Sequence, residues 1–413
     1  MKLVRDSYAW MKNPFAFLDS CGHKGLTFRQ RFLVPGKCLL TGDHELIDQI
    51  RIHPALAAGK SIQGLRRILG DDSLIMLHGE AHRQRRDIIA PYFRGESLSR
   101  LDQRIREISR EEFARAHGIF SAFAVFQKIS LRTILLHLLG DLSAAEEERA
   151  MRIVIAFLGS FTNPLVLFSR ALQVNLGRYS AWGRALANRA VLLKYLDEVL
   201  EKRPESTAGR IAEAMQSQGA THAAVKNEIM ALLLFGHDTG AAVLSWAAAH
   251  VCGNSEASER LHGKAETPGS MLLRAENYLH ACILETMRIS PSVVHVTRRT
   301  DSPVTIGEWV LEPDTAIMPC MYLAHRDARI FDRPDEFRPE RFLDTSYPSS
   351  SFFPFGLSDR LCVGMPFVLR QMQLTLGAMA QFRFKLAPGY TPAPERKLVI
   401  IIPAGGCMLE RQT

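Results

Sequence analysis

Apolar residues recur at three- and four-residue spacing almost throughout residues 95–290, which predicts a helical body. Strand-like patterns are short and lie toward the ends of the chain, at 26–42, 302–319 and 397–409. In the last of these, Pro-Ala-Gly-Gly (403–406) separates two apolar runs, which predicts a β-hairpin across that turn. We therefore expect a mainly α fold with small β-sheets, an α+β arrangement.

The chain shows no internal repeat and no low-complexity linker. Its most polar connection, residues 253–270, has helical patterns on both sides. We expect one domain over 1–413, in which a β-rich lobe is built from about 26–60, 295–320 and 395–410 and the remaining residues form a helical lobe.

The longest apolar stretch, IMALLLFGHDTGAAVLSWAAAHVCG (229–253), is interrupted by His237 and Asp238. An acid inside a membrane is expensive, so a buried helix with a functional interruption is the better interpretation. The first twenty residues carry charges and a proline every few positions, which argues against a signal peptide and against a membrane anchor.

The net charge of +8 has two interpretations, a nucleic-acid surface or arginines that hold an anion. No run of five like charges occurs and aromatic residues do not alternate with basic ones, so we expect no nucleic-acid partner. The seven cysteines are odd in number and include no C-x-x-C pair, which argues against a disulfide framework or zinc site and favours a reducing, cytoplasmic setting.

Cys362 stands just before a predicted helix, GMPFVLRQMQLTLGAMAQF (364–382), whose Pro366 suits a first turn. Free N–H groups at a helix start stabilise a thiolate, and Gly364 leaves room for a large flat group. A buried structural cysteine is the alternative, and position alone leaves both open.

The surrounding pattern, Phe355-Gly356-x-x-x-Arg360-x-Cys362-x-Gly364, resembles the haem-binding loop of the cytochrome P450 family. The resemblance implies that Cys362 is the axial ligand of a b-type haem iron and that Arg360 contacts a haem propionate. Ser358 stands where the family usually has a second glycine, so we expect a local backbone adjustment and no loss of haem.

Other family motifs follow in the family's order. Glu285-x-x-Arg288 resembles the pair that locks to an arginine of a later segment, here Arg341 in FRPERF. His82-x-x-x-Arg86 resembles a further pair of propionate contacts, as in the family.

A further propionate arginine of the family falls at Arg298, with Arg299 as the alternative if the register differs by one residue. The resemblance thus implies mainly helical P450 architecture, with haem between a central oxygen-activating helix and the helix after the cysteine loop.

The central helix of the family carries an Ala/Gly-Gly-x-Asp/Glu-Thr pattern, which is Phe235-Gly236-His237-Asp238-Thr239 here. Gly236 is expected to loosen the helix, Thr239 to bond back to a carbonyl or hold water, and Asp238 to relay protons. His237 is expected to point away from the iron. Phe235 replaces a small residue and either narrows the cavity over the haem or turns into the core.

The resemblance implies a monooxygenase that takes electrons from a separate ferredoxin and ferredoxin reductase, because no flavin or iron–sulfur domain follows the cysteine. We expect O2 and a bulky apolar substrate, such as a terpenoid or fatty acid, and a monomer. The expected pocket includes Phe235, Val293 and Val294, roofed by the apolar stretch 157–184. The alternatives are a rearrangement, coupling, desaturation or peroxide-driven reaction on the same fold, and a non-catalytic haem sensor.

Overall fold

The expected helical body is present in the computed structural model, which describes residues 1–53, 56–57, 65–160, 173–263, 268 and 272–412. Its helices are α6 (Glu96–Ser99), α7 (Asp102–Arg115), α8 (Ala122–Leu139), α9 (Ala144–Gly159), α11 (Ala181–Lys202), α12 (Thr207–Ser217), α13 (His222–Phe235), α14 (Asp238–Cys252), α15 (Ser255–Leu261) and α16 (Tyr278–Ile289). Before them come α1 (Lys2–Lys12), α2 (Pro14–Ser20), α3 (His44–Ile52), α4 (Arg66–Leu69) and α5 (Gly79–Ile89), and after them α17 (Met321–Ala324), α18 (Arg341–Asp344) and α19 (Met365–Met379).

Local sequence explains where several of these helices begin. Ser143 and Glu146 form a capping box at the start of α9. The Ser143 side chain accepts the backbone N–H of Glu146, and the Glu146 side chain accepts the backbone N–H of Ser143. The side chains of Ser121 and Thr221 cap α8 and α13, and α19 has a proline in its first turn.

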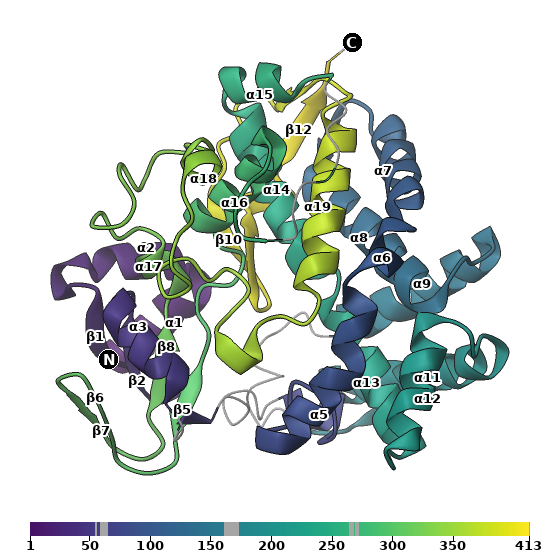
Figure 1. The fold of residues 1–413 in the computed structure, drawn as a ribbon, viewed down its shortest axis with the longest axis horizontal. Coiled ribbons are helices and arrows are strands. Elements are labelled where there is room, and N and C mark those ends of the chain that lie inside the picture. Colours follow the sequence, from purple (N-terminus) through teal and green to yellow (C-terminus); the bar gives the residue numbers. More distant parts are fainter. Residues whose placement is uncertain (54–55, 58–64, 161–172, 264–267, 269–271, 413) are drawn as a thin grey trace.

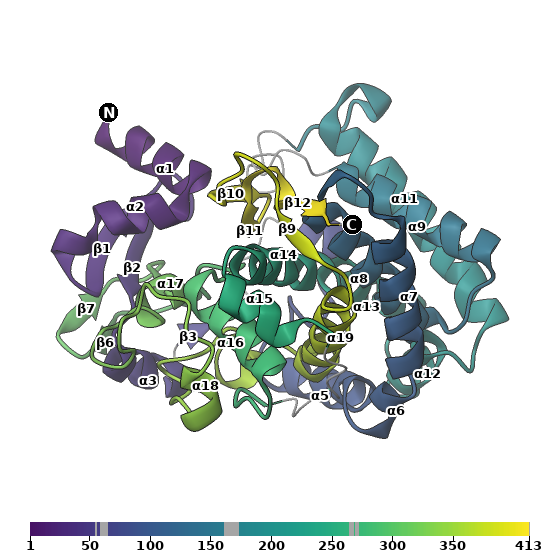
Figure 2. The ribbon, with the colours of Figure 1, turned by 90° about the horizontal axis from the view of Figure 1, so that it is seen from above.

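The middle of the molecule is formed by helices that are apolar on most of their surface. Helix α8 packs along α14, and α14 also contacts α16 and α19. By length and composition, α8 and the stretch that spans α13 and α14 are apolar enough to cross a membrane, but most of each is buried inside this fold. In Figures 1 and 2, α14, α16 and α19 lie between the amino-terminal sheet on one side and α7, α9 and α11 on the other.

The largest sheet joins strands from two distant parts of the chain. Its order is β1 (Thr27–Arg31), β2 (Lys37–Thr41), β8 (Ala316–Pro319), β5 (Arg298–Thr300) and β3 (Leu56–Ala57). Strands β2 and β8 pair in parallel, and the other neighbours are antiparallel. Strands β6 (Val304–Ile306) and β7 (Trp309–Leu311) form a separate hairpin between β5 and β8.

The hairpin predicted across Pro403–Gly406 is wrong. Strand β11 (Ile400–Pro403) pairs with the strand that precedes it, β10 (Pro394–Lys397). Strand β12 (Met408–Arg411) instead pairs with β4 (Ile119–Ser121) and β9 (Phe384–Leu386). Gly405 and Gly406 both have positive φ, and the turn they form directs the chain from one sheet to another. The strands of 395–410 therefore do not enter the five-stranded sheet.

Candidate active site

The cysteine loop is a tight turn that ends at the start of α19. The backbone N–H of Cys362 donates to the Phe355 carbonyl at 2.9 Å, and the N–H of Met365 donates to the Cys362 carbonyl at 3.3 Å. Gly356 has a φ of 92°. These bonds place the thiol two residues before the N-cap, Gly364, as the sequence pattern predicts.

Cys362 is the one exposed cysteine among the seven, all of which the structure describes. Its pKa is nevertheless raised, because surrounding protein desolvates the thiol more than the N–H groups of Gly364 and Met365 and the charge of Arg86 stabilise a thiolate. The helix start alone does not ionise this thiol, whereas a bound metal ion would.

Four cationic or protonatable side chains gather around this loop. Arg86 donates to the Leu361 carbonyl at 2.6 Å, and Arg360 donates to the Leu77 carbonyl at 2.6 Å. Arg298 lies against the same loop, with Nη2 at 3.3 Å from the Leu357 carbonyl. His82 is buried on α5, one turn before Arg86.

The charges in this cluster repel one another. Burial, then Arg360 and Arg86, lower the pKa of His82 to about 4, and burial also lowers the pKa of Arg298 and of Arg360. The carboxylate nearest to Arg360 is that of Asp359, 3.6 Å away and 59% exposed.

Among the described residues, Arg86 and Arg298 form no ion pair, and His82 Nδ1 and Arg360 Nε are buried without a hydrogen-bond partner. Uncompensated buried cations are costly, so this cluster suits a ligand that carries carboxylates.

The contacts of Arg299 show which of the two neighbouring arginines, Arg298 or Arg299, lies near the cysteine loop. Arg299 pairs with Asp314 at 2.7 Å and donates to the Pro35 carbonyl, on the far side of the strand from the cysteine loop. Arg298 is thus the residue that lies with Arg86 and Arg360.

Ser358 adopts a backbone conformation that glycine enters more readily than serine. Its φ is 56°, in the left-handed region, and its hydroxyl donates to the Arg51 carbonyl at 2.7 Å. The side-chain hydrogen bond offsets part of the strain of that conformation.

The predicted loosening of the central helix is a full interruption. Helix α13 ends at Phe235 and α14 begins at Asp238, with Gly236 and His237 between them. A Cβ on Gly236 would lie 2.6 Å from the Leu232 carbonyl oxygen, so only glycine fits there without a shift. The Thr239 hydroxyl donates back to the Phe235 carbonyl at 3.3 Å, which partly replaces the interrupted helical bonding.

Both ring nitrogens of His237 face protein groups. Nδ1 lies 2.9 Å from the Leu233 carbonyl and Nε2 lies 3.4 Å from Asp238 Oδ1, and the side chain is 1% exposed. Asp238 itself is 25% exposed and accepts a hydrogen bond from Gln127 Nε2 on α8 at 2.7 Å.

The residues expected in the substrate pocket lie in different surroundings. Phe235 is half-buried and packs against the apolar cluster formed by α8, α9, α11 and α13, and Val293 is also half-buried. Val294 is 4% exposed and belongs to the main core cluster. Of the expected roof, residues 161–172 lie outside the described residues.

Comparison with known proteins decides the family. The family model described as Cytochrome P450 matches residues 40–410. The chain belongs to the cytochrome P450 family.

Curated relatives include cytochrome P450 135B1 and cytochrome P450 138 of Mycobacterium tuberculosis, each 27% identical to this P450. The alignments cover 85% of this chain, and 77% and 81% of the two relatives. Among solved structures, a six-coordinated P450 from Thermus thermophilus has a TM-score of 0.74 at 23% identity, covering 97% of this chain and 98% of that one. The retinoic-acid-bound cyanobacterial CYP120A1 has a TM-score of 0.81 at 20% identity, covering 96% and 94%.

Family membership makes this protein a P450 monooxygenase with a haem-thiolate cofactor, and its mainly helical fold with small sheets is that of the solved P450s. The described residues fit that group, because they offer an exposed thiol beside a cluster of cations whose one paired carboxylate, that of Asp359, is 59% exposed. When bound, a haem with a thiolate ligand supplies O–O bond cleavage and C–H oxidation.

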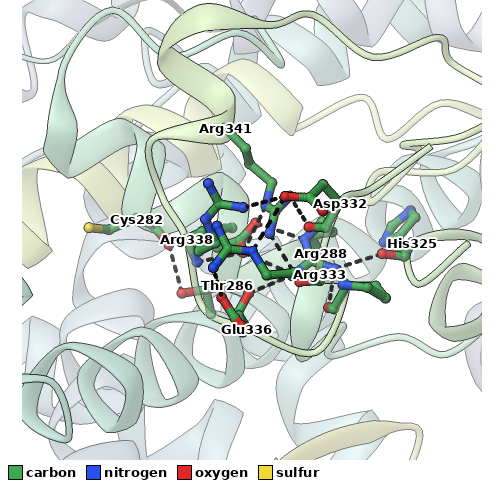
Figure 3. A network of polar contacts seen from close by, with 11 residues as sticks. Cys282, Thr286, Arg288, His325, Asp332, Arg333, Glu336, Arg338 and Arg341 are labelled. Carbon is green, nitrogen blue, oxygen red and sulfur yellow. Dashed lines mark hydrogen bonds and ion pairs between the residues drawn. The ribbon is translucent and has the colours of Figure 1, made fainter. Parts of the chain in front are cut away.

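A second predicted motif forms a buried ionic network away from the thiol. Arg288 is fully buried and pairs with Glu285, through Nε at 2.7 Å and Nη2 at 2.9 Å, and Arg341 reaches the same carboxylate at 3.1 Å. Arg288 also donates to the carbonyls of His325 and Pro334. Figure 3 shows Arg288 of α16 beside Arg338 and Arg341, which come from the segment at the start of α18.

Two residues that contact the predicted motifs, His325 and Gln127, belong to no sequence pattern that would have identified them. His325 gives its carbonyl to Arg288 and accepts the backbone N–H of Phe353 through Nε2 at 3.1 Å, so it joins the ionic network to the start of the cysteine loop. Gln127 carries the single side-chain amide of a mostly apolar helix, and only the fold shows that it meets Asp238.

Proposed function

We propose that this P450 inserts one oxygen atom from O2 into a C–H or C=C bond of a bulky apolar molecule. The observation that supports this most directly is the pair of Asp238 and Thr239 at the interruption between α13 and α14. An acid and a hydroxyl placed there serve proton delivery during oxygen activation, which a haem sensor does not need.

For the haem we propose Cys362 as the axial ligand, with Phe355 and Gly364 beside it. His82, Arg86, Arg298 and Arg360 would hold the propionates, because they surround the loop and Asp359, the one carboxylate paired with them among the described residues, is 59% exposed.

For the protons we propose a route through Asp238 and Thr239. Asp238 is partly exposed and so is able to exchange protons with solvent, whereas the Thr239 hydroxyl is held near the broken helical bonds at Gly236. For structure we propose that Glu285, Arg288 and Arg341 support the loop that carries the thiolate, through His325.

Bacterial P450s typically receive electrons from ferredoxin systems. For this chain we propose a separate ferredoxin and its reductase, because the net charge of +8 suits an acidic partner. We further propose a cytoplasmic monomer whose residues 1–413 form one domain, since strands from residues 27–57 and 298–319 share one sheet.

The thiolate assignment is tested by the carbon monoxide spectrum. The reduced protein under carbon monoxide should show the strongly red-shifted Soret band of thiolate ligation, and Cys362→Ala should abolish it. Cys252→Ala is the matched control and should keep the band. The assignment is overturned if the two variants behave the other way round.

The reaction class is tested by oxygen and electron consumption with a surrogate ferredoxin and reductase. A panel of fatty acids, terpenoids and retinoic acid is first screened for a shift of the haem spin state. A responding compound should then be oxidised only when reductant is supplied. Product formed with peroxide and without reductant would instead support the peroxide-driven alternative, and product formed with neither would support a rearrangement.

A further inference from the structure

Gln127 makes the one direct hydrogen bond from another helix to the Asp238 carboxylate within the described part of the chain. Its Nε2 donates to Oδ1 at 2.7 Å, from the first half of α8, 111 residues earlier in the sequence. The two helices pack along each other, so both side chains are anchored by the core around them.

The environment of the carboxylate differs between its two oxygens. Oδ1 faces Gln127 Nε2 and, at 3.4 Å, His237 Nε2, whereas Oδ2 accepts no hydrogen bond from any described residue. No arginine or lysine in that part of the chain forms an ion pair with Asp238. Lys128 and Arg132 on α8 are committed to Glu112, at 2.8 and 2.9 Å.

This arrangement orients the carboxylate without fixing its charge. A cation in place of Gln127 would hold the group as an anion, whereas an uncharged amide donor restrains Oδ1 and leaves the other oxygen able to take up and release a proton. We propose that Gln127 is a positioning residue for proton delivery, which holds Asp238 Oδ1 so that Oδ2 serves the relay. This inference rests on the proposed function of Asp238.

The experiment uses the haem-loaded full chain with surrogate ferredoxin, reductase and NADPH, and O2 alone as the probe. Without an organic substrate, one NADPH per O2 yields hydrogen peroxide (two electrons and two protons), whereas two NADPH per O2 yield two molecules of water (four electrons and four protons). The peroxide fraction therefore measures failed proton delivery.

Gln127→Leu removes the donor, and we expect the peroxide fraction to rise roughly threefold to tenfold or to approach its maximum, which is less than the ~100-fold or more that a general acid itself contributes, because Asp238 remains. Gln103→Leu is the matched control. Gln103 on α7 also donates through Nε2 to a carboxylate, that of Glu107 at 2.9 Å, but on the exposed surface, so this variant should match the wild type.

Gln127→Glu separates positioning from packing. At high pH two carboxylates would face each other and repel, so the peroxide fraction should be as high as in Gln127→Leu. At lower pH the pair shares one proton, and the resulting O–H restores the donor to Asp238, so coupling should recover as the pH falls from about 8 to 6. His237 is the titratable neighbour of this pair, and the wild type measured over the same range corrects for it.

A readout independent of turnover comes from melting temperatures of Gln127→Leu, Asp238→Ala and the double variant. If the contact exists, the double variant should lose less than the two single losses added together. Two outcomes would overturn the proposal. One is that the losses in melting temperature are additive. The other is that the peroxide fraction of Gln127→Glu does not change with pH and that of Gln127→Leu equals the wild-type value.

Failure of the proposed function would have a different signature. If Asp238→Ala leaves the peroxide fraction of the wild type unchanged, Asp238 is not the relay. If Asp238→Ala raises that fraction and Gln127→Leu does not, only the role of Gln127 is refuted.

Discussion

Glu285→Gln tests how strongly the ionic network supports the fold. The carboxylate has an exposure of 0% and accepts four hydrogen bonds, two from Arg288, one from the Arg338 backbone N–H at 2.8 Å and one from Arg341. Glutamine keeps the shape but removes the charge and turns an N–H group toward arginine donors. Because Arg288 and Arg341 would remain as buried, unneutralised cations, we expect a loss of about 3–5 kcal/mol in the free energy of unfolding.

Urea unfolding followed by far-ultraviolet circular dichroism measures this loss. Glu259→Gln is the matched control, since Glu259 pairs with Arg383 at a similar distance, 2.8 Å, but both side chains are more than half exposed. Solvent screens that surface pair, so its removal should change the midpoint little. A Glu285→Gln midpoint as close to the wild type as that of the control would refute the reasoning.

Four further predictions concern single positions. Thr239→Ala should keep its haem but release more hydrogen peroxide, and unchanged coupling would mean that protons arrive by another route. Phe235→Ala should cost ~1–3 kcal/mol and broaden the products if the ring faces the substrate, or ~3–5 kcal/mol with unchanged products if it faces the core, which melting temperature and product analysis on one variant distinguish. Ser358→Gly should change stability by less than about 1 kcal/mol, because relief of the left-handed strain offsets the lost bond to Arg51, whereas Ser358→Ala should cost ~0.5–1.5 kcal/mol by denaturant titration; equal effects would contradict this balance. Burial lowers the pKa of His137 from 6.5 to about 4, so the free energy of unfolding of the wild type should fall as the pH drops from 6.5 to about 4. His137→Phe should lose up to about 3 kcal/mol less over that pH range, and urea midpoints that fall in parallel for the two proteins would contradict this.

Helical periodicity was sufficient to predict the body of the fold, because α8, α13 and α14 have local apolar patterns and α8 and α13 also have side-chain caps. It failed for the last strands. The Pro403–Gly406 turn has the local chemistry of a hairpin, but β12 pairs with β9 and with β4, three residues that carry no strand pattern of their own. Pairing between distant segments is decided by packing, which local sequence does not report.

The residues of the candidate site likewise divide into those that local sequence patterns identify and those that only long-range packing brings together. Cys362, Arg360 and Arg86 could be found because their spacing follows a family pattern. The contact of Gln127 with Asp238 could not, since nothing in the sequence of an apolar helix tells which distant helix its single amide will face. The left-handed conformation of Ser358 was equally hidden, because serine is seldom found there.

The pairing of β12 with β4 also bears on how the protein is made. The backbone N–H of Ala122, the first residue of α8, donates to the Cys407 carbonyl at 2.9 Å, and Ser121 bonds to Gly406, 285 residues later in the chain. On a ribosome those partners would emerge roughly 15–60 s after β4, at ~5–20 residues per second. During that interval α8 would lack the hydrogen bond between its first residue and Cys407, and a nascent chain released before residue 407 would lack the strand that pairs with β4.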